Sequence, residues 1–214
     1  NYNADATQDD GSCDYCSCGG SDTSGASPYT LTVESSAPAV ASNGTTYRFY
    51  VNMVNSTDQL SAVYGTDTEP LIINTPSGIF NSPFNTSWNA SGVNAALFPV
   101  FPDVADDSYA TIGLSGPAIS SGLAGAADPS KVEDGNLNPT ISQYFVTGGT
   151  QLNVNTLTGG SWYSLTTDAN ALPDSEGRVL AMQITTTGEI SGTLNFQIFP
   201  LGVGADKIYL TIDF

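Results

Sequence analysis

The clearest pattern in the chain is a strict alternation of apolar and polar residues near its C-terminus. Residues 190–199 and 207–214 each place an apolar side chain at every second position, and the second run ends on Phe214. A period of two puts the apolar side chains on one face of a β-strand. With residues 178–186 and the turn that follows, the pattern predicts a meander of three half-buried antiparallel strands. The outer edge of the last strand then needs a partner or a cover.

Shorter runs predict further strands, at residues 28–34, 46–54, 61–64, 70–74, 96–101, 108–114, 141–146, 151–154 and 161–165. Turn residues lie between these runs, and no segment keeps a 3.6-residue apolar period, so we expect helices to be short or absent. Residues 77–91 and 116–140 are predicted to be surface loops. Many short strands with turns between them favour an all-β fold, a β-sandwich of jelly-roll-like or immunoglobulin-like type.

Composition divides the chain into three parts. Residues 1–18 form a short acidic and cysteine-rich segment, and residues 19–27 are rich in Gly and Ser, as flexible linkers are. Residues 28–214 form the predicted β-sandwich domain. The sequence starts at Asn1, so we expect any signal peptide to have been removed already.

The charge balance excludes several classes of partner. The chain has 21 acidic and 4 basic residues and a formal net charge of −17. Binding to nucleic acid or to anionic membranes needs Lys and Arg, which are scarce here, and no apolar run is long enough to span a bilayer. Histidine is absent, which removes the usual general base and the commonest zinc ligand. We therefore expect a non-catalytic protein.

The N-terminal segment carries many oxygen ligands in quick succession, and Gly11 lies among them. Candidate calcium ligands are Asn3, Asp5, Asp9, Asp10 and Asp14. Calcium takes six to eight oxygen ligands from a loop that can wrap around it. The spacing differs from that of an EF-hand loop, and the alternative is an acidic, solvated segment without a metal.

Three cysteines lie within the same segment, at Cys13, Cys16 and Cys18. Such crowding favours a small disulfide-bonded knot in an oxidising compartment, since zinc would lack a fourth ligand. One cysteine is left free or joins a cysteine outside this sequence.

The motif NYNxxATxDDGSC at residues 1–13 resembles a repeat of large secreted and cell-surface proteins of aquatic bacteria. These repeats are similar to calcium-binding thrombospondin type 3 units and precede an extracellular β-domain of uncharacterised activity. Residues 47–55, 61–65, 101–113 and 177–199 resemble that domain. The resemblance implies a secreted, extracellular or cell-surface location and a calcium-binding first segment. The cysteines that usually precede the motif are missing here.

The first strand of the main domain follows the flexible linker. Its apolar residues Tyr29, Leu31 and Val33 alternate with polar ones. One interpretation makes it the first strand of its own sheet. The other makes it an assembly strand, which the linker carries to an open sheet edge of a neighbouring copy.

The loop at residues 77–91 contains two candidate sugar contacts, Phe84 and Trp88. Aromatic side chains in a long loop also serve to anchor it to its own domain. Asn-x-Ser/Thr triplets mark four candidate glycosylation sites, at Asn43, Asn55, Asn85 and Asn89. Three nearby carboxylates, Asp103, Asp106 and Asp107, are predicted to form a solvated turn, with a second cation site as the alternative.

These observations favour a structural subunit of an extracellular filament or surface assembly, joined by strand complementation. A calcium-dependent adhesin or carbohydrate-binding module is the alternative, followed by a passive spacer domain. An enzyme with paired carboxylates ranks last, because no spacing singles out a pair among the acidic turns that contain Asp103 and Asp174.

Overall fold

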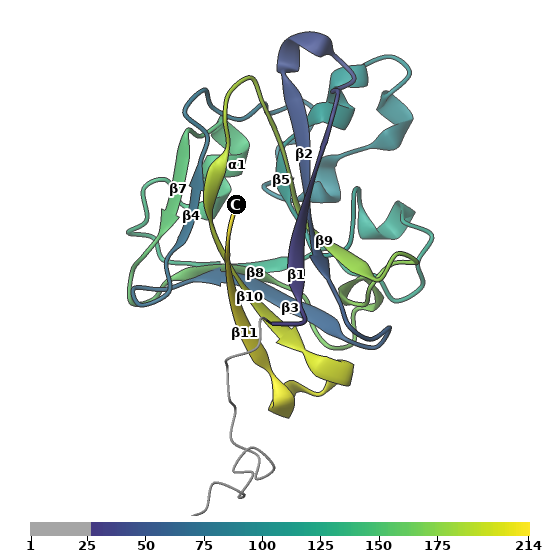
Figure 1. Cartoon of the computed structure of the whole chain (residues 1–214). Helices are drawn as coiled ribbons and strands as arrows, with labels where there is room; N and C mark the ends of the chain where they lie inside the picture. Colours follow the sequence, from purple (N-terminus) through teal and green to yellow (C-terminus); the bar gives the residue numbers. More distant parts are fainter. Residues whose placement is uncertain (1–26) are drawn as a thin grey trace, which may run out of the picture.

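Two antiparallel sheets pack face to face in the computed structural model, which describes residues 27–214 (Figure 1). The first sheet has the strand order β1-β2-β9-β5. Its strands are β1 (Thr30–Ser36), β2 (Thr45–Asn52), β5 (Tyr109–Ala110) and β9 (Arg178–Thr186). The predicted all-β sandwich is therefore confirmed.

The second sheet is built around β10, which has neighbours along both edges. Its strands are β3 (Gln59–Gly65), β4 (Leu71–Asn74), β6 (Ser130–Glu133), β7 (Gln151–Val154), β8 (Gly160–Tyr163), β10 (Ser191–Phe199) and β11 (Ile208–Asp213). One edge of β10 pairs with β11, and the other pairs with β3 and β4, which follow each other end to end. Beyond these, β8 pairs with β3, β7 with β4, and β6 with β8.

Asn195 holds the break between β3 and β4. Its buried side-chain amide donates to the carbonyls of Tyr64, Glu69 and Pro70 at 3.1, 2.8 and 3.1 Å. The Tyr64 carbonyl lies near the end of β3, and those of Glu69 and Pro70 lie in the excursion between β3 and β4. A polar residue in the middle of β10 is thus satisfied by backbone carbonyls at the junction of the two strands.

The helices are short. They are α1 (Ile141–Thr147) and the single-turn 3-10 helices η2 (Ala41–Asn43), η3 (Ala90–Gly92), η4 (Ala95–Leu97), η5 (Pro102–Asp106), η6 (Ala118–Ser120), η7 (Ala169–Ala171), η8 (Pro200–Gly202) and η9 (Gly204–Asp206). Among residues 27–214, no helix has the length and hydrophobicity needed to cross a bilayer.

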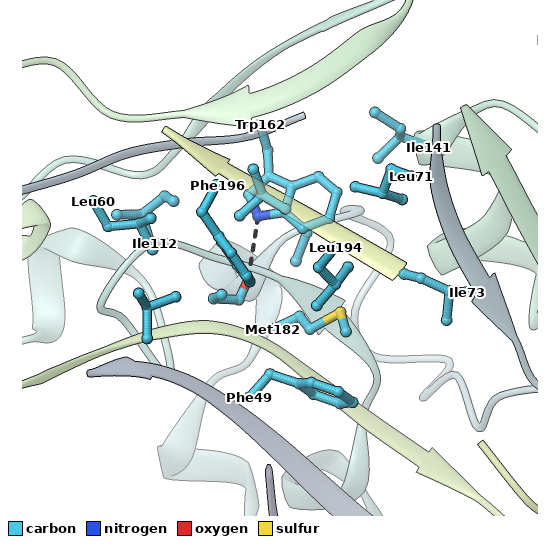
Figure 2. Packing of buried hydrophobic residues seen from close by; sticks show 14 of the residues in the cluster. Phe49, Leu60, Leu71, Ile73, Ile112, Ile141, Trp162, Met182, Leu194 and Phe196 are labelled. Atoms are coloured by element: carbon cyan, nitrogen blue, oxygen red, sulfur yellow. Dashed lines mark hydrogen bonds between the residues drawn. The ribbon is translucent and has the colours of Figure 1, made fainter. Parts of the chain in front are cut away.

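The core lies between the two sheets and is centred on Trp162 of β8 (Figure 2). This side chain is fully buried, and its indole N–H donates to the carbonyls of Thr111 and Ala181 at 3.2 and 3.1 Å. Since Ala181 lies on β9, the bond links the two sheets. Figure 2 also shows Phe196 of β10 and Phe49 of β2 in the same cluster.

Most predicted strands are present within a few residues of their expected bounds, but residues 141–146 form a helix. Thr140 accepts a hydrogen bond from the backbone N–H of Gln143, and the Gln143 side chain accepts one from the backbone N–H of Thr140. This capping box starts α1, and Gly148 ends it in the left-handed conformation. The apolar run by itself predicts a strand, because the helix signal lies in the caps and not in the periodicity.

Three other predictions differ from the structure. Residues 96–101 contain a 3-10 turn instead of a strand, because the side chain of Asn94 caps the N–H of Ala96. Residues 108–114 are mostly buried, but only Tyr109–Ala110 pairs as a strand. Within the predicted excursion at residues 116–140, β6 was missed.

The predicted C-terminal meander is wrong in its first member. β10 and β11 do form an antiparallel hairpin, with Phe196 opposite Leu210. β9 instead pairs with β2 and β5 in the other sheet. The turn after β9 therefore carries the chain from one sheet to the other. β9 is covered on both faces and is buried at all positions except Arg178. The prediction of a half-buried strand is therefore wrong for β9.

Candidate functional site

One lateral side of the sandwich is closed by the loop at residues 77–91. Asn89 forms a parallel bridge with Ala110 of β5, whose N–H donates to the carbonyl of Trp88 at 3.1 Å. The side-chain amide of Asn89 donates to the carbonyl of Pro129, next to β6, at 3.3 Å. Trp88 packs against the core. The loop thus bridges the edge strands β5 and β6 of the two sheets.

Asp107 anchors this loop from within. Its fully buried carboxylate accepts hydrogen bonds from the backbone N–H of Ser82 at 2.6 Å and from the side-chain amide of Asn85 at 2.7 Å. Burial raises the pKa of Asp107 to about 7, although these N–H donors act in the opposite direction. Among residues 27–214, no basic side chain forms a salt bridge with it.

The opposite lateral side has no comparable cover within the part of the chain that the structure describes. Its edges are β1 and β11, which lie on the same side of the sandwich in Figure 1. Phe214, next to the end of β11, meets Phe49 of β2 edge to face with ring centroids 4.9 Å apart. Among the strands of residues 27–214, β1 pairs with β2 alone, and β11 pairs with β10 alone. We call this side the open side and define it by these two strands.

Apolar side chains on the open side are incompletely buried. Those of β11 and the C-terminal residue pack against the core but stay partly exposed; they are Ile208, Leu210, Ile212 and Phe214. On the neighbouring strand β10, Leu194, Phe196 and Ile198 are fully buried. On β1, Leu31 is half-buried and Val33 is 37% exposed. Within residues 27–214, the core is therefore only partly covered along both edges of this side.

Polar contacts hold β1 on its outer face. Glu34 forms a salt bridge with Arg178 of β9, whose guanidinium lies 3.9 Å above the ring centre of Tyr50. The side-chain amide of Asn52 donates to the hydroxyls of Thr30 and Thr32 at 2.9 and 2.8 Å. All these partners belong to β2 and β9.

The connection between β1 and β2 is fixed by Asp106. Its buried carboxylate accepts hydrogen bonds from the N–H groups of Ala39 and Val40 at 2.5 and 2.9 Å, and from the side-chain amide of Asn43 at 3.0 Å. Asp106 and Asp107 therefore serve two different segments and are both buried. The predicted solvated turn is wrong for these two residues, because each carboxylate is enclosed by the backbone that it binds.

Several predicted sites lie outside the residues that the structure describes. They are the candidate calcium ligands Asn3, Asp5, Asp9, Asp10 and Asp14 and the cysteines Cys13, Cys16 and Cys18. Within residues 27–214, no group of three or more Cys, Asp and Glu side chains is placed to hold a metal ion. Asp174 and Glu176, in the acidic turn before β9, both interact with Arg178.

The four candidate glycosylation residues differ in their surroundings. Asn55 is exposed in the turn between β2 and β3, and Asn43 is half-buried. Asn85 and Asn89 are buried, and their side-chain amides donate to Asp107 and Pro129. Sequence could not separate these cases, because burial here depends on partners distant in the chain.

The two candidate sugar contacts also differ. Phe84 is 42% exposed and stacks on Phe101, which is 39% exposed, with ring centroids 4.3 Å apart. Trp88 is half-buried and packs against the core, with the Lys131 ammonium 6.0 Å from its ring centre. Trp88 thus anchors the loop, and Phe101 joins Phe84 on the surface. Phe101 was missed because it follows the loop by some ten residues.

Comparison with known protein families, with characterised proteins and with solved structures finds no match for this chain.

Proposed function

We propose that the chain is a non-catalytic structural subunit of an extracellular filament or surface assembly, and that copies join along the open side. The observation that carries this proposal is the partly exposed apolar face of β11, on the same side of the sandwich as the partly covered β1. A monomer gains stability when such residues are covered, since burial contributes about 25 cal/mol per Å² of apolar surface. Unpaired strand edges also offer main-chain groups to another chain.

Exchange of β1 between copies is the form of strand complementation that we favour. In the isolated chain β1 pairs with its own β2, from Thr30 opposite Asn52 to Ser36 opposite Thr46. Its remaining ties, such as Glu34 with Arg178, reach only β2 and β9. A neighbouring copy offers the same β2 and β9, so an exchanged β1 remakes every one of these contacts. The exchange has to open the connection at residues 37–44, which joins β1 to β2 and is held by Asp106 in the isolated chain, so that it spans the two copies.

A disulfide across this pair of strands tests the exchange. In the variant Thr30→Cys/Asn52→Cys the new cysteines lie directly opposite each other. Isotope-labelled and unlabelled chains are mixed before assembly, oxidised and digested, and the linked peptides are weighed by mass spectrometry. Exchange gives peptides that join a labelled to an unlabelled strand. Links within one label only, in fully assembled material, would contradict exchange.

Light scattering of the unmodified full chain and of a chain without residues 1–36 tests assembly itself. We expect large particles from the full chain and much smaller ones from the deletion. Monomers at every concentration of the full chain would overturn the structural-subunit proposal.

The alternative is a calcium-dependent adhesin or carbohydrate-binding module, and the exposed pair Phe84 and Phe101 favours it. Sugar rings pack against exposed aromatic faces. Binding on a glycan array that is lost in Phe84→Ala but kept in Val100→Ala, a change of an exposed neighbour, would support this function.

Calorimetric titration of the full chain with calcium, compared with the variant Asp9→Ala/Asp10→Ala, tests the predicted calcium ligands. No heat of binding in the full chain would refute the calcium prediction.

A further inference from the structure

The unpaired edge of β11 presents a defined set of backbone groups. Gly192 and Phe214 exchange two hydrogen bonds, at 3.1 and 3.0 Å, so they form a hydrogen-bonded pair of the β10–β11 ladder. Such pairs alternate along an antiparallel ladder. The N–H and C=O groups of Tyr209, Thr211 and Asp213 therefore point away from β10. They form a row of donors and acceptors along the outer edge of β11.

The sequence of this edge is complementary to itself. When two antiparallel copies of β11 are aligned so that Leu210 lies opposite Leu210, Ile208 lies opposite Ile212 on the face toward the core. On the other face, Tyr209 lies opposite Thr211, and Lys207 lies opposite Asp213. Each residue with outward backbone groups then meets another such residue, which the hydrogen-bond pattern requires.

We propose that β11 pairs with β11 of a second copy of this chain about a two-fold axis at Leu210, and that two Lys207–Asp213 ion pairs set the register. This pairing joins the β10–β11 sheets of the two copies into one continuous sheet. It also covers part of the partly exposed apolar row formed by Ile208, Leu210 and Ile212.

Charge supports a copy of the same chain as the partner. The chain has four basic residues, and two of those in residues 27–214, Lys131 and Arg178, form salt bridges within the domain. Lys207 forms none within these residues, although it directly precedes the edge strand. Asp213 accepts a hydrogen bond from the hydroxyl of Thr193 at 2.6 Å and has its second carboxylate oxygen available. In a chain of net charge −17, a lysine at the joint offsets local repulsion where two copies meet.

This inference rests on the proposed function in one respect, that copies associate. It differs in symmetry, because a two-fold joint uses the same surface on both copies and closes at two. Exchange of β1 is head-to-tail and can continue without limit. The two joints are therefore separable: one extends a row of subunits, and the other pairs subunits side by side.

Charge reversal tests the register. We use the full chain with β1 locked by the Thr30→Cys/Asn52→Cys disulfide, so that only the β11 joint remains, and measure dimer dissociation by sedimentation equilibrium. In Asp213→Lys, Lys207 of each copy lies opposite the new lysine of the other copy. These two like-charge pairs should raise the dissociation constant of the dimer about tenfold or more. If only the overall charge of the copies mattered, Asp213→Lys should strengthen the dimer, because it takes the net charge of each chain from −17 to −15.

The double variant Lys207→Asp/Asp213→Lys restores two opposite-charge pairs at the original net charge and should recover most of the lost affinity. Melting curves of each variant at monomer concentration check the fold, since Asp213 also contacts Thr193. Weakening by either single change without recovery in the double variant would refute this register.

A cysteine on the axis gives a second test that does not depend on charge. In Leu210→Cys, the two new thiols lie in a non-hydrogen-bonded pair, where Cα atoms are about 4.5 Å apart, within the range for a disulfide. Peptide mapping should find a 210–210 link between chains, and Tyr209→Cys, which is out of register with itself, should give little. Assembly of the full chain with neither this link nor any effect of charge reversal would refute the β11 joint and leave the proposed function standing. A full chain that never associates would refute both.

Discussion

The two lateral sides of this sandwich are finished in different ways. On one side, Trp88 and Asn89 bridge the edges β5 and β6, and the buried Asp107 holds the loop that carries them. On the other side, the edges β1 and β11 are left with partly exposed apolar residues such as Leu210. The same chain thus covers one pair of edges with its own loop. The difference suggests that the open side is completed by another molecule, and the predictions below probe it.

The largest expected effect is a difference in lost stability between two phenylalanines of the second sheet, both of which face the core. Phe196 of β10 is fully buried, whereas Phe214, which pairs with Gly192 farther along β10, is half-buried. Phe196→Ala should lower the free energy of unfolding by about 3–5 kcal/mol, because it leaves a cavity. Phe214→Ala should cost the monomer only about 1–2 kcal/mol. Urea unfolding of both variants at monomer concentration measures this; equal losses would mean that the open side is already closed in the single chain.

The closed side should make stability depend on pH through Asp107. Its pKa is about 7 in the folded chain and about 3.9 in an unfolded one, so the folded chain holds the proton across this interval. The free energy of unfolding should therefore fall by a few kcal/mol as pH rises from about 4 to about 7. Urea unfolding across this range should show the slope, and Asp107→Asn should flatten it. A slope that survives in Asp107→Asn but disappears in the control Asp103→Asn would contradict this account.

Asp106 should influence how readily β1 leaves its own sheet. Asp106→Ala leaves the N–H groups of Ala39 and Val40 without their acceptor, which should cost about 1–3 kcal/mol of stability. It should also speed the mixing of labelled and unlabelled strands in the cross-linking experiment. Asp103→Ala is the control and should change stability by less than about 0.5 kcal/mol. An effect of Asp103→Ala as large as that of Asp106→Ala would show that general charge, not this anchor, is responsible.

The smallest effect is expected at the salt bridge of β1. The Glu34 side chain is 47% exposed, so Glu34→Gln should change the free energy of unfolding by about 0.5 kcal/mol or less. Its influence should appear in local opening, as faster hydrogen exchange of β1 amides with unchanged exchange in β10. Unchanged exchange in β1 would mean that Arg178 does not help to retain this strand.

The sequence predicts the half-buried strands best. In β1 and β11 one face meets the core and the other is exposed, and in β10 the apolar residues share the core face, so alternation marks these strands directly. It predicts less well where burial covers both faces, as in β9, whose sheet was assigned incorrectly. The helix α1 was missed because its signal lies in the caps at Thr140 and Gly148 rather than in periodicity.

The functional features divide in the same way. The open outer edge of the last strand and the two alternatives for β1 follow from local pattern. The loop that closes the other side does not, since it depends on Asp107 meeting Ser82 and Asn85 across more than twenty residues. A buried Asn looks the same in sequence as an exposed one, which is why Asn85 could not be distinguished from Asn55.

Hydrogen exchange measured by mass spectrometry on assembled and dissociated full chain tests the central claim most directly. We predict that assembly slows exchange in peptides covering β11 and β1, where copies are proposed to meet. Peptides covering β5 and β6, the edges that the loop already closes, should not change. Protection confined to the region of Phe84 and Phe101, with β1 and β11 unchanged, would contradict the account.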